Sequence, residues 1–255
     1  MGHLYAITLT VYRRSGQVPE KLRGAIPLPP SDAGFAASSD KALESPRVPT
    51  VKPSKSLAMG FRSHSGWAAL VVVTGPLRAP TAAARTRIEL ADPAIPGSKQ
   101  PYHAAEKLPF NQAEELVTRC VAASRSLARQ ALQTAIAGAR QDGHAVVGCG
   151  ILLASGRPLT TLADTLASHA LIHTAEGELF RNVIVEAARE LKLPVIGIKE
   201  KELLSRASKE LRMSVDELQS CLADMGRTLG PPWRQDEKYA ALIGWLALAA
   251  TTRRN

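Results

Sequence analysis

Two histidines and a glutamate recur at helical spacing in one segment of the chain, at His169, His173 and Glu176. Steps of four and three residues bring side chains to one face of a helix, so these three groups can converge on a point. Neutral imidazole and carboxylate suit Zn²⁺, Mn²⁺ or Fe²⁺, and the same groups can transfer protons as general acid and base. The spacing therefore predicts a metal centre, a metal-free catalytic or anion-binding site, or a structural polar network.

A second set of polar residues directly precedes an apolar run that begins at Trp67. His64 stands between Ser63 and Ser65, and Arg62 comes just before them. These residues are expected at the end of a strand, and strand ends often border the ligand crevice of an open α/β sheet. The segment is interpreted either as a holder of phosphate oxygens, through hydroxyl and backbone N–H groups, or as a plain loop.

Four further polar residues are candidates with weaker signals. His103 follows a loop rich in proline and glycine and would complete the first histidine set if the two segments meet, although surface exposure is the default. Glu89 is the carboxylate of a predicted strand and is expected to face solvent or a covered groove. Asp236 is adequately explained by the positive end of a helix dipole, and Lys238 beside it can serve an anion.

Hydrophobic periodicity predicts the elements that must position these residues. Apolar or alternating runs predict strands at 67–73, 85–90, 145–153 and 194–198, the third either kinked or closely approached at its two glycines. Helical patterns cover 112–140, 161–192 and 236–250, and a capping box at Ser214–Glu217 opens another helix. On the 161–192 helix the two histidines and Glu176 share a stripe with apolar residues that is expected to face the sheet, so all three are expected to point into the interior or into a cleft in it. This order of elements predicts an α/β layered domain with a mixed sheet.

Composition restricts the classes of protein to consider. The 255 residues are 45% apolar, 22% charged and 4% aromatic, with a formal net charge of +9. Three isolated cysteines exclude a disulfide framework, and no apolar stretch is long enough to span a membrane. No dinucleotide fingerprint, Walker A loop or serine-hydrolase elbow is present, so no nucleotide cofactor is expected. We expect a cytoplasmic protein whose charge permits nucleic acid as a partner without requiring it, in an oligomeric state that the sequence does not specify.

The first 58 residues differ from the remainder of the chain. They are rich in proline and turn-forming residues, and they are expected to form a disordered or loosely attached extension. Met59 directly precedes the first convincing structural segment, so one hypothesis places the true start of the protein there. Residues 59–255 are expected to form the folded domain.

Three segments of this domain resemble the ribonuclease H-like fold, in particular its Holliday-junction resolvase branch. Gly60 to Ala68 is similar to that branch's first strand and turn, and Glu176 to Val195 is similar to its helix and following Leu-Pro-Val strand. Asp236 with Ala240 resembles the last helix, whose acidic residue joins the metal site. The chain also resembles an uncharacterised bacterial family that carries Ser-His-Ser-Gly-Trp-Ala and Ile-His-x-Ala-Glu-Gly-Glu. The resemblance implies a three-layer fold with a mixed central sheet.

The chain departs from this family at one position. The family places an aspartate in the first strand, but residues 59–65 hold no carboxylate. Glu89, Glu176 and Asp236 are candidates for three of the acids that a two-metal nuclease needs. His64 is a candidate replacement for the missing one, which would favour a softer metal than Mg²⁺.

The residues and the resemblance together predict a phosphodiesterase or nuclease that uses Mg²⁺, Mn²⁺ or Zn²⁺ and acts on nucleic acid or another phosphate-containing substrate. The residues expected to be catalytic are Glu176, His173, His64, Glu89 and Asp236. Those expected to bind substrate are Arg62, Ser63, Ser65, His103 and Lys238, and those expected to bind metal are His169, His173 and Glu176. The alternatives are a non-catalytic module that binds nucleic acid or protein on the same fold, and a metal-independent hydrolase for a small anionic metabolite.

Overall fold

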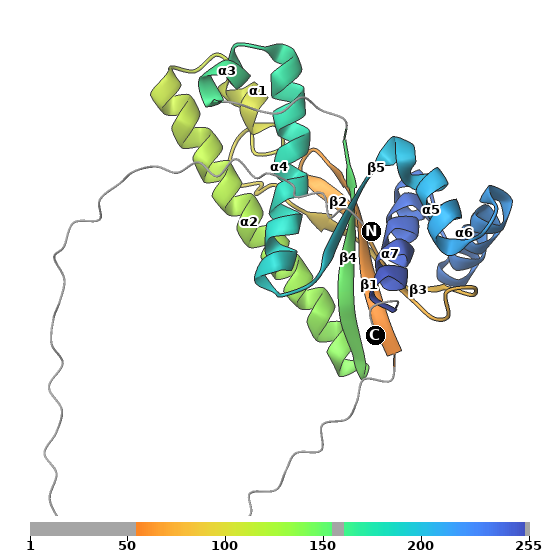
Figure 1. Ribbon diagram of the computed structural model, residues 1–255. Helices are drawn as coiled ribbons and strands as arrows, with labels where there is room; N and C mark the ends of the chain where they lie inside the picture. The colour runs from red at the N-terminus through yellow and green to blue at the C-terminus, as the bar shows by residue number, and fades with distance from the viewer. Residues whose placement is uncertain (1–54, 155–160, 253–255) are drawn as a thin grey trace, which may run out of the picture. The chain divides into compact units, whose positions relative to one another are not determined.

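Five strands form one mixed sheet in the computed structural model, which describes residues 55–154 and 161–252 (Figure 1). The strand order is β3-β2-β1-β4-β5. The strands are β1 (Lys55–His64), β2 (Trp67–Thr74), β3 (Thr81–Glu89), β4 (His144–Leu153) and β5 (Val195–Lys199). β2 runs antiparallel to both neighbours, whereas β1, β4 and β5 are parallel. This arrangement confirms the α/β class with a mixed central sheet that is expected from the sequence.

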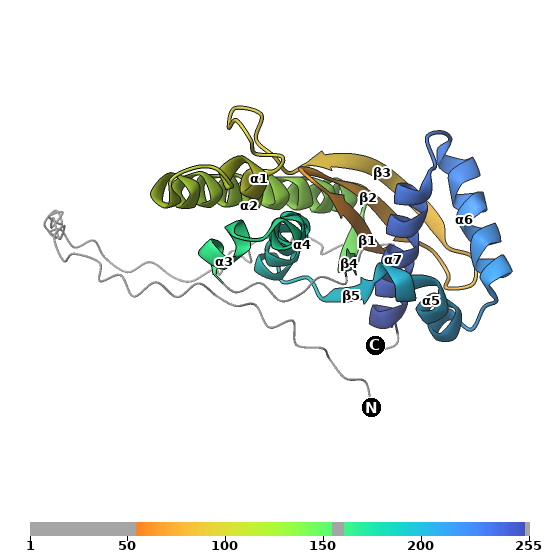
Figure 2. The ribbon, with the colours of Figure 1, turned by 90° about the horizontal axis from the view of Figure 1, so that it is seen from above.

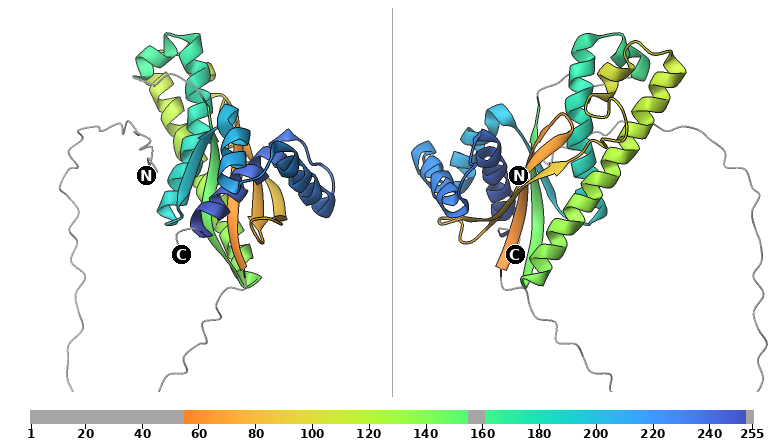
Figure 3. Two further views of the ribbon diagram at one scale, coloured as in Figure 1. Left: turned by 45° about the vertical axis from the view of Figure 1, so that its right-hand side comes forward. Right: turned by 180° about the vertical axis from the view of Figure 1, so that it is seen from behind.

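Helices cover both faces of the sheet, which gives the expected three layers (Figures 2 and 3). One face carries α1 (Pro101–Ala105), α2 (Phe110–Gln141), α3 (Leu162–Leu166) and α4 (His169–Glu190). The other face carries α5 (Leu203–Leu211), α6 (Val215–Leu229) and α7 (Gln235–Thr252), and a 3-10 turn at Glu200–Glu202 follows β5. The capping box expected before α6 is confirmed, since the Ser214 hydroxyl accepts from the N–H of Glu217. None of the helices described is long and apolar enough to cross a membrane.

α7 lies directly on the sheet because the strand residues that face it are small. A Cβ on Gly60 of β1 would stand 1.8 Å from the carbonyl oxygen of Ala240, and one on Gly150 of β4 would stand 2.3 Å from that of Ile243. The close approach expected at β4 is therefore confirmed at Gly150. All residues of α7 from 240 to 249 are buried, since α5 and α6 cover the side of the helix that faces away from the sheet.

The central strand β1 was absent from the strands predicted by periodicity. Its buried residues run from Leu57 to Phe61 without alternation, because helices cover it on both sides. β1 begins at Lys55, so the predicted domain boundary between residues 58 and 59 falls inside a strand in which Leu57 and Ala58 are already buried. The remainder of the predicted extension, residues 1–54, lies outside the described residues.

The helix predicted over 161–192 is two helices. α3 ends at Leu166 and α4 begins at His169, with Ser168 in an extended conformation (φ −137°, ψ 111°) between them. This break separates the start of the predicted stripe from the remainder, so the side chains before and after it do not follow one helical wheel. Gly177, by contrast, lies inside α4 without interrupting it.

Candidate functional site

Three histidines converge at the end of α4 that α1 covers. His169 and His173 lie one turn apart on α4, and His103 comes from α1. One ring nitrogen from each lies within 4.8 Å of the others, and the Nε2 atoms of His169 and His173 are 3.1 Å apart. The rings meet edge-on, with centroids 4.5 to 5.4 Å apart. These three residues, called here the histidine site, are the only group in the described ranges that combines three such ligands so closely.

Glu176 supports the histidine site from the protein interior. Its side chain is 4% exposed, and its Oε1 accepts from the backbone N–H groups of Tyr102 (2.9 Å) and His103 (3.1 Å). The same oxygen lies 3.3 Å from the Nδ1 of His103. One carboxylate therefore fixes the start of α1 on α4 and sets the orientation of the His103 ring.

The burial of Glu176 leaves its charge only partly compensated. Burial raises the pKa of Glu176 above its ordinary value, although the hydrogen bonds from His103 and Tyr102 oppose the shift. Burial and the nearby Glu176 also raise the pKa of Tyr102 to about 12. The second oxygen of Glu176, Oε2, is buried without a hydrogen-bond partner. Such an orphaned polar atom marks a place where the electrostatic balance of the site is incomplete.

The converging set differs from the one expected in two respects. Glu176 is buried as expected, but His169 and His173 are exposed, with 65% of the His169 side chain accessible. The expectation that they face the sheet is wrong because the first two turns of α4 lie against α1 rather than against the strands. His103, expected to bind substrate, takes the third position, while Glu176 contacts His103 and not the histidines of its own helix.

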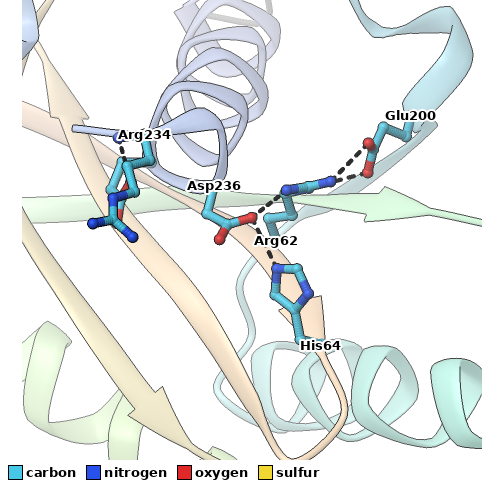
Figure 4. Close-up of polar contacts among 6 residues, drawn as sticks. Arg62, His64, Glu200, Arg234 and Asp236 are labelled. Atoms are coloured by element: carbon cyan, nitrogen blue, oxygen red, sulfur yellow. Dashed lines mark hydrogen bonds and ion pairs between the residues drawn. The ribbon is translucent and has the colours of Figure 1, made fainter. Parts of the chain in front are cut away.

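A second cluster forms where β1, β5 and α7 meet, on the opposite face of the sheet (Figure 4). Arg62 of β1 donates from Nε and Nη2 to the two oxygens of Glu200, at 3.1 and 2.9 Å. Its Nη1 donates to Oδ1 of Asp236, and the same oxygen lies 2.9 Å from the Nε2 of His64. The four residues Arg62, His64, Glu200 and Asp236 are called here the arginine cluster.

Opposite charges offset one another in part within the arginine cluster. Burial alone would raise the pKa of Asp236, but His64 and Arg62 together bring that pKa below its ordinary value. Burial would lower the pKa of Arg62, and the two carboxylates, Glu200 foremost, more than reverse this effect. Arg62 and Asp236 thus each favour the ionised form of the other.

Neighbouring side chains hold this cluster in place. The His64 ring stacks on Trp67, with centroids 4.4 Å apart, and the guanidinium of Arg87 lies 3.9 Å from the centre of the Trp67 ring. Arg85 donates to the carbonyls of Gly230, Pro231 and Pro232, which fixes the segment that leads into α7. The N–H of Arg234 donates to the Glu237 carboxylate at 2.7 Å and caps the same helix (Figure 4).

The remaining predicted site residues lie apart from both groups. Glu89 pairs with Arg87 at 2.5 Å, with more than half of its side chain exposed. Ser63 alternates with Arg62 and His64, so it belongs to the other face of β1, and Ser65 is exposed in a tight turn with Gly66 at φ +82°. Lys238 is exposed on α7.

The acids expected to assemble around metal ions do not meet. Glu176 lies on α4 and Asp236 on α7, which are separated by the sheet, and Glu89 pairs on the edge strand β3. Glu200 was not among the site residues predicted from the sequence. Its position directly after β5 was an available signal, because the parallel strands β1, β4 and β5 end at the same edge of the sheet.

Comparisons with known proteins give only a distant likeness. No family model matches the chain, and no curated protein sequence matches it. Among solved structures, a chain described as "T. thermophilus RuvC in complex with Holliday junction substrate" superposes with a TM-score of 0.43 at 10% identity, over 77% of this chain and 95% of that one. The chain of "Thermus thermophilus RuvC structure" gives the same score and identity over 78% and 96%.

Proposed function

We propose that this protein is a divalent-metal-dependent phosphodiesterase whose metal is held by His103, His169 and His173, with nucleic acid as its class of substrate. The observation that carries the proposal is the convergence of three ring nitrogens from two helices within 4.8 Å. Ligands that come from two separate elements meet only because the tertiary fold brings α1 onto α4. The spacing on α4 alone would not assemble them.

The residues present fit a transition metal better than Mg²⁺. Three imidazoles are the ligand set of catalytic zinc sites, which keep a further position for water or substrate. His169 and His173 are exposed, so such a position would be reachable from solvent. The contact of Glu176 with the His103 Nδ1 leaves Nε2 of that ring for a metal, and a carboxylate behind a ligand histidine is the usual support of such sites.

The residues of the chain have separate parts in the proposed reaction. Glu176 orients His103, and Glu106, whose Oε1 lies 3.9 Å from the Nδ1 of His169, does the same for that ring at the exposed side. A bound divalent metal supplies Lewis-acid activation of water and of a phosphoryl oxygen. The net charge of +9 favours the approach of a polyanion over that of a neutral substrate.

The test begins with the metal content of the full chain after loading with Zn²⁺ and gel filtration. We expect about one equivalent in the wild type and none in His173→Ala or His103→Ala. His64→Ala removes an imidazole outside the site and should retain the metal. Cleavage of bis-p-nitrophenyl phosphate and of DNA should fall about 100-fold or more in His173→Ala and on chelation. A wild type that takes up no metal would refute the proposal.

A non-catalytic nucleic-acid-binding module is the second candidate. The observation that favours it is the arginine cluster, in which the guanidinium of Arg62 is already paired with both carboxylates, those of Glu200 and Asp236. A protein that binds DNA in a salt-dependent manner, holds metal at the histidine site and cleaves no phosphodiester would support this candidate over the first.

A further inference from the structure

The arginine cluster gathers the groups that could surround a cation, and one of those groups is itself a cation. Asp236 and Glu200 come from α7 and from the turn after β5, and both contact the guanidinium of Arg62. The Arg62 side chain is only 18% exposed, so its positive charge is held at a largely buried position and is not supplied by an ion from solvent. Its position on β1 places it between two acids that are far apart in the sequence.

The metal that the family resemblance implies at Asp236 does not fit this set of residues. Mg²⁺ requires octahedral oxygen ligands, including at least one available carboxylate. Glu200 is engaged through both oxygens in a bidentate pair, and Oδ1 of Asp236 is shared by Arg62 and His64. A divalent ion would have to break these charge-assisted bonds or bind through the remaining oxygen of Asp236, and in either case it would lie beside a partly buried positive charge.

We propose that the guanidinium of Arg62 takes the place of a divalent cation between Asp236 and Glu200, so that the native cluster binds no Mg²⁺ and Arg62→Asp converts it into a Mg²⁺ site. Arg62 thereby ties β1, β5 and α7 together without a metal. Divalent-metal chemistry in this protein is then confined to the histidine site, and the arginine cluster holds structure and charge.

The charges explain why a single substitution at Arg62 would allow the arginine cluster to bind Mg²⁺. With Arg62, the guanidinium cancels one of the two carboxylate charges and its N–H groups satisfy their oxygens. With an aspartate at this position, three carboxylates would share one small region and repel one another until a cation bound. The added carboxylate would also supply an oxygen ligand from β1, where the native chain has none.

The experiment measures thermal melting of the full chain with and without 10 mM MgCl₂, at equal ionic strength. The wild type should show no specific shift. Arg62→Asp should melt at a lower temperature than the wild type without Mg²⁺ and should gain about 3–6 °C with it. Arg62→Ala, which adds no negative charge, should show a smaller gain in the same direction.

Arg125→Asp is the matched control, because Arg125 also pairs with a carboxylate, that of Glu186, but at a more exposed site with a single partner. It should show no Mg²⁺ gain. Two results would overturn the proposal: Mg²⁺ binding by the wild type in calorimetry that Asp236→Asn abolishes, or an absence of any Mg²⁺ gain in both Arg62 variants. Because imidazoles are poor ligands for Mg²⁺, neither result depends on whether the histidine site holds metal.

Discussion

The histidine site and the arginine cluster lie on opposite faces of one sheet and differ in how their charges are balanced. In the histidine site, ring nitrogens from α1 and α4 face one another, and the buried Oε2 of Glu176 has no hydrogen-bond partner. In the arginine cluster, a guanidinium from β1 occupies the space between two acids. We propose that a cation from outside completes the first arrangement, whereas the second already contains one in Arg62.

This difference shows that a count of acids and histidines does not identify a metal site. The arginine cluster has two carboxylates and an imidazole, which is a plausible ligand set by residue type alone. Arg62 argues against a metal in this cluster, because each acid there already pairs with its guanidinium. What distinguishes the histidine site is the absence, among the described residues around it, of an arginine or lysine that contacts its ring nitrogens.

Gly60→Ala should give the largest effect, and it should act on the face of the sheet that α7 covers rather than on the histidine site. The added methyl group would overlap the carbonyl oxygen of Ala240, so α7 must move away from β1, and we expect a loss of about 3 kcal/mol in the free energy of unfolding. Denaturant unfolding measures this loss. Gly138→Ala on α2, where a Cβ meets nothing within 4 Å, should instead be neutral or stabilise the protein by about 0.5–1 kcal/mol.

The same variant tests whether the regions are independent. A Gly60→Ala protein that still folds should bind Zn²⁺ at the histidine site as the wild type does, because the sheet lies between α7 and the helices α1 and α4. Weakened Zn²⁺ binding in that protein would show that the two regions are coupled through the sheet.

Glu176→Gln should weaken the histidine site without removing it. The amide oxygen can still accept from the N–H groups of Tyr102 and His103, but the charge that orients the His103 ring is lost. We expect the affinity for Zn²⁺ to fall about 10- to 100-fold, measured by competition with a chelator. Glu178→Gln, on the same helix but paired with Arg181, is the control and should keep the wild-type affinity. Equal affinities in all three proteins would mean that Glu176 serves only to fix α1.

Asp236→Asn should give the smallest effect and one that depends on pH. The folded-state pKa of Asp236 is below its ordinary value of 3.8, so its ionised form contributes stability above that pH. This contribution is lost as the pH falls below about 4 toward the folded-state pKa. We expect the variant to be about 1–2 kcal/mol less stable than the wild type at pH 7, with a narrower difference at pH 3.

Urea unfolding at several pH values measures this change. The groups that face Asp236 are Arg62 and His64, and Glu200 lies on the far side of the same guanidinium. Asp216→Asn, at an exposed position in the first turn of α6, provides the reference and should not show the same convergence at low pH. A difference between wild type and Asp236→Asn that stays constant from pH 7 to pH 3 would contradict the assigned ionisation.

Sequence periodicity was sufficient to predict the elements that bury only one face. α2 agrees with the predicted span of 112–140 because its apolar residues follow helical spacing, and α6 begins where the capping box at Ser214 predicted a helix. β1 was missed because its residues are buried on both faces, which removes the alternation that identifies a strand. The break at Ser168 was not predicted, because no glycine or proline marks it in the sequence.

The candidate site was predictable only in part, for a related reason. The burial of Glu176 follows from its place on the apolar stripe of α4, and His103 was a stated candidate to complete the set. The exposure of His169 depends on where α1 packs, which no local pattern specifies. The pairing of Arg62 with Glu200 joins residues 138 positions apart, so it depends on the parallel arrangement of the strands that carry them.

The docking of α7 on the sheet is expected to be a late step in the folding of the chain. The helix contributes ten successive buried residues, 240 to 249, and it follows every strand in the sequence. Until it has been synthesised and has docked, the glycine-lined side of β1 and β4 faces water, and Asp236, one of the two carboxylate partners of Arg62, is not yet in place. Contacts that span 174 residues, such as Arg62 with Asp236, are slow to form, so we expect the nascent domain to depend on chaperones until this helix is in place.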